Sequence, residues 1–309
     1  MSKSAAIELR SADASRRRRW ARRLLYLFVI LLISFIGLAV LSWRVGGQLI
    51  APAPRTVGPA PADFPCKNVS IRSESGSTLA GWFAVPENPR GVVVLLHGIR
   101  STRLSMLQRA RQLYAARYAV LLVDFQSHGE SPGECITLGH LEARDARAAV
   151  EFARTQCNDL PIAVVGKSLG GAAALIASPL NIDALVIESV YPTIEEATSN
   201  RLQMRLGSLA PFAMPLLSCQ LGLRLGIGVG DLQPIGRIKE VGCPILVISG
   251  CEDRHTTMPE TKRLFGAARE PKQLLLMEGA AHQDLERFDP TKYQNVVLEF
   301  LDTFLDRSE

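Results

Sequence analysis

Near the middle of the chain, residues 162–176 read Ile162-Ala163-Val164-Val165-Gly166-Lys167-Ser168-Leu169-Gly170-Gly171-Ala172-Ala173-Ala174-Leu175-Ile176. This stretch begins with a short β-branched run typical of a buried strand and ends in an apolar helix rich in small residues. Between the two lies G-x-S-x-G, in which small residues permit a tight strand-to-helix turn that exposes a serine hydroxyl. Glycine and serine are common, so the five residues alone are weak evidence. The strand before them and the helix after them make the prediction specific.

Strand and helix patterns alternate on both sides of this turn. Buried strands are expected at Val92–Leu96, Val120–Phe125, Ile162–Val165, Ala184–Ile187, Ile245–Ile248 and Gln273–Met277. Helices are expected at 104–117, 139–156, 169–178, 258–269 and 291–306. A hairpin of Val69–Ile71 with Leu79–Val85 precedes them. The alternation predicts one α/β domain over 67–309, with a doubly wound, mostly parallel sheet.

A serine hydroxyl becomes nucleophilic at neutral pH with the help of a base, which a carboxylate orients. In folds built on this turn, the acid and then the histidine follow the serine, each past the end of a later strand. Asp253 follows the strand at 245–248, and His282 follows the strand at 273–277. We therefore predict that Ser168, Asp253 and His282 form a catalytic triad.

Glu252 and His255 are the nearest rivals for the acid and the base. Asp253 is favoured because the G-x-x-D spacing from Gly250 places it past the strand end. His255 would crowd Asp253, two residues away on the same loop, and would not reach Ser168. The remaining histidines precede the serine and are expected to be structural: His97, His128 and His140.

Two backbone N–H groups are needed to stabilise the negative charge that develops on the substrate oxygen. One is expected from Leu169, directly after the serine, and the other from the loop after the first parallel strand. That loop contains Gly98, where the backbone can approach closely, so Ile99 is the predicted second donor.

Five ordered motifs are similar to those of the α/β-hydrolase superfamily, especially its membrane-anchored bacterial esterase-like and serine-aminopeptidase-like branch. They are L-L-H-G at 95–98, D-F-Q-S-H-G-E-S at 124–131, G-K-S-L-G-G at 166–171, the Gly250/Asp253 loop and His282. The resemblance implies the α/β-hydrolase fold, and a structural role for Asp124 and the His128-Gly129 turn beside the site. Ile99-Arg100 stands where many relatives carry a small or polar residue, so the resemblance does not extend to the substrate.

Positive charge is confined to the N-terminus. The formal net charge is +5, whereas residues 1–23 carry eight basic and two acidic side chains, +8 − 2 = +6, so residues 24–309 sum to −1. A nucleic-acid binder usually carries a basic surface on its folded body, so no nucleic-acid partner is expected.

An uncharged stretch of 20 residues, Leu24 to Trp43, follows this basic tail. As a helix it is about 30 Å long, enough to cross a bilayer. We predict a single membrane-spanning helix over 24–44, with the basic tail 1–23 in the cytoplasm and the rest of the chain on the extracytoplasmic side. The competing reading is a cleaved signal peptide, with Ala51-Pro52-Ala53 near the cleavage point, but the apolar core is longer than signal peptides usually have.

Two further segments are set apart by composition. Residues 45–66 contain five prolines and are expected to form an extended linker from the membrane to the domain. Residues 191–235 interrupt the strand–helix alternation with apolar helical patterns, and we interpret them as a lid beyond the carboxyl edge of the sheet. The apolar residues over 202–229 either pack the lid onto the domain or line a pocket for an acyl chain.

The cysteines show neither a C-x-x-C pair nor zinc-ligand spacing: Cys66, Cys135, Cys157, Cys219, Cys243 and Cys251. No metal or cofactor is expected, because the glycines at 226, 228 and 230 also follow no strand and do not fit a nucleotide site. Disulfides are permitted outside the cytoplasm, but sequence does not choose their pairing. A disulfide between Cys243 and Cys251 is disfavoured, because the two lie at opposite ends of one expected strand.

Together these features predict a membrane-anchored serine hydrolase that cleaves carboxylic ester or thioester bonds of a small-molecule or lipid-like acyl substrate. An exopeptidase or amidase of the same fold would use the same residues. A membrane-tethered binding module is the non-enzyme alternative, and the presence of all three triad residues argues against it.

Overall fold

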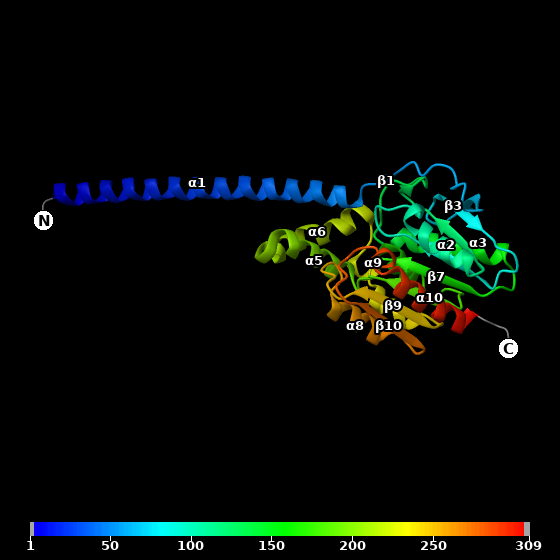
Figure 1. Ribbon diagram of the computed structural model, residues 1–309. Helices are drawn as coiled ribbons and strands as arrows, with labels where there is room; N and C mark the ends of the chain where they lie inside the picture. The colour runs from blue at the N-terminus through cyan, green and yellow to red at the C-terminus, as the bar shows by residue number, and fades with distance from the viewer. Residues whose placement is uncertain (1–2, 306–309) are drawn as a thin grey trace. The chain divides into compact units, whose positions relative to one another are not determined.

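The computed structural model describes residues 3–305, with the helical backbone alone for residues 3–15. It contains two compact units, residues 1–48 and 49–309, which are described separately. The first is part of α1 (Lys3–Ile50), a continuous helix whose apolar side chains between 24 and 41 are exposed (Figure 1). Two stretches are long and apolar enough to cross a membrane by length and composition: 16–50, near the N-terminus, and 194–225.

The helix boundary differs from the expected one. We placed the end of the helix at residue 44, whereas α1 continues to Ile50, so residues 45–50 are helical and do not belong to an extended linker. These six residues contain no proline, and Pro52 is the first residue that disfavours the helical conformation just before it.

An eight-stranded sheet forms the centre of the second unit, in the order β10-β9-β8-β7-β4-β5-β3-β2. The strands are β2 (Lys67–Arg72), β3 (Thr78–Ala84), β4 (Gly91–Leu96), β5 (Tyr118–Val123), β7 (Ile162–Lys167), β8 (Ala184–Glu188), β9 (Ile245–Gly250) and β10 (Lys272–Met277). All neighbours are parallel except the pairs that β3 forms with β2 and β5. The predicted fold class is therefore confirmed.

Helices cover both faces of this sheet (Figure 1). On one face, α2 (Leu107–Ala115) and α10 (Pro290–Leu305) pack against side chains of the central strands, and the short α9 (Leu285–Phe288) contributes Leu285. On the other face lie α3 (His140–Gln156), α4 (Leu169–Ala177) and α8 (Met258–Ala267). Strands buried on both sides explain the continuous apolar runs in the sequence.

The proline-rich segment is packed and not a free spacer. Its residues 53–54 form β1 (Ala53–Pro54), which pairs in parallel with β6 (His128–Gly129). The backbone N–H of Arg55 donates to the carbonyl of Gly129, and Phe64 is buried in the core on the α2 face. Proline disfavours helices and central strands, but it does not prevent such an extended segment from lying along a domain surface.

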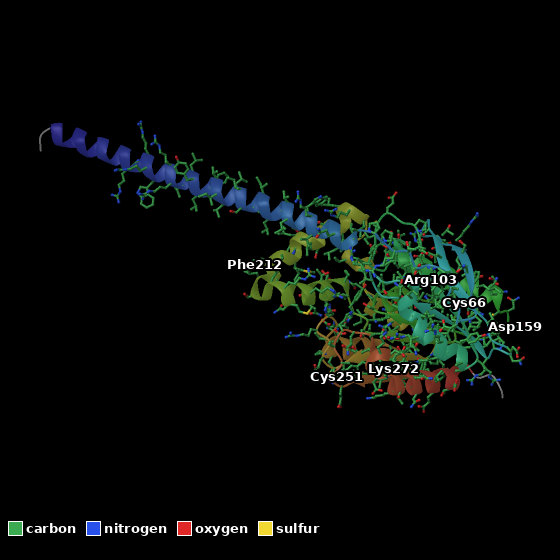
Figure 2. All side chains as sticks on the ribbon, turned by 45° about the horizontal axis from the view of Figure 1, so that its top comes forward. Cys66, Arg103, Asp159, Phe212, Cys251 and Lys272 are labelled. Carbon is green, nitrogen blue, oxygen red and sulfur yellow. The ribbon has the colours of Figure 1, made fainter. Side chains whose placement is uncertain are left out.

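The insertion between β8 and β9 is helical. It contains α5 (Ile194–Leu206), the turn η2 (Gly207–Leu209), α6 (Ala210–Leu225) and shorter elements up to η4 (Ile238–Glu240), among them η3 (Val229–Asp231) and α7 (Pro234–Arg237). At the tip, Leu209 and Phe212 are 63% and 76% exposed, and Figure 2 shows Phe212 at the far end of the hairpin from the sheet. The Phe212 side chain is therefore mostly exposed, whereas Leu221 and Leu225 pack against the core.

The burial of Phe64 yields a stability prediction. Phe64→Ala should lower the free energy of unfolding by about 3 kcal/mol, because a buried aromatic ring is replaced by a cavity. Urea unfolding of the full chain in detergent, followed by tryptophan fluorescence, measures the change. Thr56→Ala, an exposed position in the same segment, is the matched control and should have little effect. Equal stabilities of the two variants would mean that the segment is a free linker after all.

Candidate active site

The turn between β7 and α4 holds Ser168 in a strained conformation. Its φ of 50° and ψ of −111° are unusual for a residue with a side chain, and such strain costs on the order of 1–3 kcal/mol. A Cβ atom on Gly170 would lie 2.2 Å from the Leu96 carbonyl oxygen, and one on Gly166 would lie 2.5 Å from the Gly171 nitrogen. The glycines of the motif are therefore required by close backbone packing, which brings the turn against the end of β4.

Asp253 and His282 meet across two loops at the carboxyl ends of neighbouring strands. Asp253 follows β9 and His282 follows β10, and Asp253 Oδ2 accepts a hydrogen bond from His282 Nδ1 at 2.7 Å. The Asp253 side chain is fully buried and that of His282 is 22% exposed. This pairing leaves His282 Nε2 as the ring nitrogen available to a second partner.

The charge on Asp253 is stabilised by its surroundings. Burial raises the pKa of this carboxyl, but the hydrogen bond and charge of His282 and the N–H groups of Thr256 and His255 lower it, and the net pKa is below the usual value. These N–H groups donate to Asp253 Oδ1 at 2.9 and 2.8 Å. The carboxylate is therefore ionised at neutral pH and can orient an imidazole.

His255 lies against His282 and does not replace it. The two rings stack with centroids 4.7 Å apart and an interplanar angle of 26°. Burial, the neighbouring His282 and Arg201 lower the pKa of His255, so this ring favours the neutral form. His255 thus contacts Asp253 through its backbone N–H and His282 through its ring.

The loop after β4 lies beside the serine. A Cβ on Gly98 would stand 3.7 Å from both the Lys167 carbonyl oxygen and the Ser168 Cβ, so the backbone passes close to the turn. The backbone of Ile99 follows directly, and Leu169 begins α4, where the first amides have no partner within the helix. Both predicted oxyanion donors therefore belong to backbone segments that adjoin Ser168.

Backbone contacts connect the serine turn to the acid loop. The Ser168 N–H donates to the Glu188 carbonyl at 2.7 Å, and the neighbouring Ser189 carbonyl accepts from Thr256 Oγ1 at 3.4 Å. A Cβ on Gly250 would lie 2.2 Å from the Ala280 carbonyl oxygen, so the loops of Asp253 and His282 also pack directly together.

Three residues that are expected to be structural, His97, Asp124 and His128, are buried and hydrogen bonded. His97 is buried, accepts the Phe125 N–H at Nε2, and has a pKa lowered to about 3, first of all by burial. Asp124 accepts the N–H groups of Arg103 and Glu130 at 2.6 and 3.0 Å and pairs with the Arg103 guanidinium. His128 is also buried, with Nδ1 2.8 Å from the Gln126 carbonyl.

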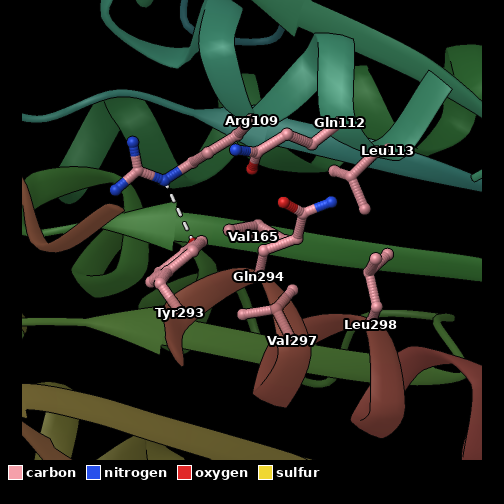
Figure 3. Close-up of a pocket in the computed structure, with 8 residues that line it drawn as sticks. All are labelled: Arg109, Gln112, Leu113, Val165, Tyr293, Gln294, Val297 and Leu298. Carbon is pink, nitrogen blue, oxygen red and sulfur yellow. Dashed lines mark hydrogen bonds between the residues drawn. The ribbon is translucent and has the colours of Figure 1, made fainter. Parts of the chain in front are cut away.

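A buried charge cluster near the site was not anticipated. The Arg109 guanidinium, 2% exposed, donates to both carboxylate oxygens of Glu188 at 2.9 and 2.7 Å. It also lies 3.0 Å from Asp284, which pairs with Lys167 at 3.0 Å. Figure 3 shows Arg109 of α2 above Tyr293 of α10, with Nε hydrogen bonded to the tyrosine hydroxyl at 3.1 Å. Sequence offered one signal for this cluster, an arginine within an apolar helical pattern.

A cleft of about 830 Å³ opens next to the acid, between α5 and the loop after β9. It is lined by Asn200, Gln203, Met204, Cys251, Glu252, Asp253, Arg254, Thr257, Met258 and Pro259. All six cysteines lie within the described residues and all are free, among them Cys243 and Cys251 near the two ends of β9. In residues 16–305 no three His, Cys, Asp or Glu side chains are grouped to hold a metal ion.

Residues 87–223 match the model of the serine aminopeptidase S33 family. Uncharacterized protein Rv2307c of Mycobacterium tuberculosis is 29% identical over 88% of this chain and 94% of its own length. Human monoglyceride lipase is 25% identical over 63% of this chain and 76% of its own. The Pyrococcus furiosus esterase Pf2001 superposes with a TM-score of 0.68 at 22% identity, over 83% of this chain and 98% of that one. The sheet order and the likeness to this esterase show that the chain has the α/β-hydrolase fold.

Proposed function

We propose that this chain is a membrane-anchored serine hydrolase that cleaves carboxylic ester or thioester bonds through an acyl-enzyme. The observation that carries the proposal is the 2.7 Å hydrogen bond between Asp253 and His282, on loops packed against the edge where the strained Ser168 turn ends β7. A histidine that is hydrogen bonded to an aspartate can activate the hydroxyl of a serine in such a strand-to-helix turn for attack on an acyl carbon.

In the proposed mechanism the Ser168 hydroxyl attacks the acyl carbon and His282 Nε2 accepts its proton. Asp253 holds the ring and stabilises the imidazolium. The N–H groups of Ile99 and Leu169 donate to the oxyanion of the tetrahedral intermediate. His282 then protonates the leaving alcohol or thiol, and a water molecule, deprotonated by the same ring, releases the acid and regenerates Ser168.

The stacked His255 ring supports this assignment of roles. The His255 ring covers one face of His282, and its lowered pKa favours the neutral form, so the proposed mechanism gives it no proton to transfer. Asp253 is charged and its other oxygen is occupied by two N–H groups, so its geometry is fixed before substrate arrives. Such preorganisation lowers the reorganisation that the reaction requires.

The substrate class follows from the surfaces near the site. The cleft beside Asp253 has polar and apolar walls, and the nearby α5–α6 hairpin exposes Met204, Leu206, Leu209, Phe212 and Leu223. Contiguous exposed apolar side chains are typical of proteins that bind lipid-like molecules or surfaces. We infer an acyl substrate that is either a small molecule or lipid-like.

Anchoring through residues 24–43 is part of the proposal. It is supported by the uncharged apolar run, by the exposed apolar side chains of α1 and by the arginines that precede them. The orientation places the N-terminus in the cytoplasm and the hydrolase domain on the extracytoplasmic side. A cleaved signal sequence is the alternative, and the topology experiment below separates the two.

Peptide hydrolysis is the second candidate, because residues 87–223 are similar to the serine aminopeptidase family. The same triad would attack an amide, and a group that captures the free amino terminus would be needed in addition. Amino-acid p-nitroanilides, assayed beside p-nitrophenyl esters, distinguish the two activities.

The triad yields a direct prediction. His282→Ala should reduce turnover of a model ester by about 10³-fold or more, because triad members act as a unit. A fluorophosphonate probe should label the wild type and fail to label Ser168→Ala. His255→Ala, which removes the stacked ring but not the base, is the matched control and should keep most activity. Reversed outcomes for the two histidines would overturn the assignment, and absence of labelling in the folded wild type would favour a binding module.

The anchor yields a second prediction, concerning topology. A reporter that is active only outside the cytoplasm, fused after Glu309, should be active, because the arginines keep the N-terminus inside. The full-length protein should also remain with membranes after a high-salt wash, which removes peripherally bound proteins. A protein of reduced mass found free in the extracytoplasmic fluid would instead indicate a cleaved signal sequence.

A further inference from the structure

We propose that Lys167, Asp284 and Arg109 form a positioning cluster that holds the loop of His282 against the turn of Ser168. The inference rests on the proposed function, because it assigns the cluster to the same site. Lys167 directly precedes Ser168, and Asp284 follows His282 by two residues. Their side chains pair at 3.0 Å, so one ion pair bridges the two loops that must exchange a proton.

Arg109 fixes this bridge to the body of the domain. Its guanidinium lies 3.0 Å from one Asp284 oxygen and 3.3 Å from the other, while its other bonds hold Glu188. The Glu188 carbonyl in turn accepts the Ser168 N–H at 2.7 Å. One buried arginine thus contacts Glu188, whose carbonyl accepts the Ser168 N–H, and Asp284, which lies two residues after His282.

The charges in the cluster are balanced. Two cations, Arg109 and Lys167, face two anions, Glu188 and Asp284, and the hydroxyl of Tyr293 donates to Glu188. Burial raises the pKa of Asp284, but Arg109 and Lys167 outweigh it and lower the pKa to about 2. The Asp284 carboxyl is therefore ionised at neutral pH and can pair with both cations.

A role in positioning explains these groups better than stability does. Buried ion pairs often contribute little net stability, because removing charges from water offsets their attraction. The loop of His282 has no regular structure between β10 and α9, and its helical support, α9, is only four residues long. A misplacement of about 1 Å between reacting groups costs roughly 100-fold in rate.

The kinetic test removes each half of the bridge. Lys167→Met and Asp284→Asn should each lower kcat for a p-nitrophenyl ester by about 10- to 100-fold while KM changes less than about threefold. Asparagine retains the N-cap that Asp284 provides to α9, so this variant removes only the charge. Lys167→Arg, which keeps the charge, should restore most of kcat, and the double variant should be no slower than the slower single one.

The matched control lies on the same helix as Arg109. Arg111 forms an exposed ion pair with Asp63, and Arg111→Met should leave kcat and KM unchanged. A fall in kcat for Arg111→Met equal to that of Lys167→Met would indicate a general loss of charge and overturn the proposal. So would full activity in Asp284→Asn.

Hydrogen exchange tests the bridge without relying on turnover. In the full-length protein in detergent micelles, Lys167→Met should accelerate amide exchange in peptides covering 278–288, on the loop that Lys167 contacts through Asp284. Exchange in α3 should stay as in the wild type. Unchanged exchange at 278–288 would overturn the coupling. If the wild type cleaves neither esters nor amides, that result alone overturns the proposed function. The coupling between Lys167 and the loop of His282 is then tested by amide hydrogen exchange at 278–288.

Discussion

The backbone of the serine turn packs closely against the end of β4, and this contact determines where α4 begins and where the loop of Gly98 runs. Because a side chain at residue 170 would meet the Leu96 carbonyl at 2.2 Å, α4 begins directly on top of the loop that carries His97 and Gly98. That contact places the N-terminus of α4 and the backbone of the Gly98 loop next to Ser168. The parallel sheet then delivers the acid and the base to the same edge, since all carboxyl ends of parallel strands meet there.

Much of this was predictable from local patterns. Buried strands read as apolar runs, and the G-x-S-x-G turn, Asp253 and His282 stand just past strand ends, so the sheet and the acid–base pair followed from spacing. The parts that did not follow depend on contacts distant in sequence. The five prolines of residues 45–66 do not indicate that β1 pairs with β6. The cluster around Arg109 brings together side chains from α2, β7, β8 and α10, which are far apart in the sequence. The helix α1 extends beyond the predicted end at residue 44, because that end was chosen where the uncharged stretch stops and not where the helical conformation becomes unfavourable.

The site contains two kinds of electrostatic environment within a few residues. Asp253 faces backbone N–H groups and the ring of His282, whereas Asp284 faces the side chains of Arg109 and Lys167. In the proposed mechanism the histidine partner of Asp253 gains and loses a proton. Asp284 is instead held by two cationic side chains at once, and its pKa is lowered to about 2.

The packed segment after α1 determines where the protein can be divided. Arg100, the neighbour of Ile99, donates to the carbonyls of Leu49 and Ala51, and the Ile136 N–H donates to the carbonyl of Ile50. A fragment that begins at residue 67, where the composition suggests the domain starts, would lose these partners and leave the loop of Ile99 with one support fewer. A fragment that begins at or before Leu49 keeps all three of these hydrogen bonds.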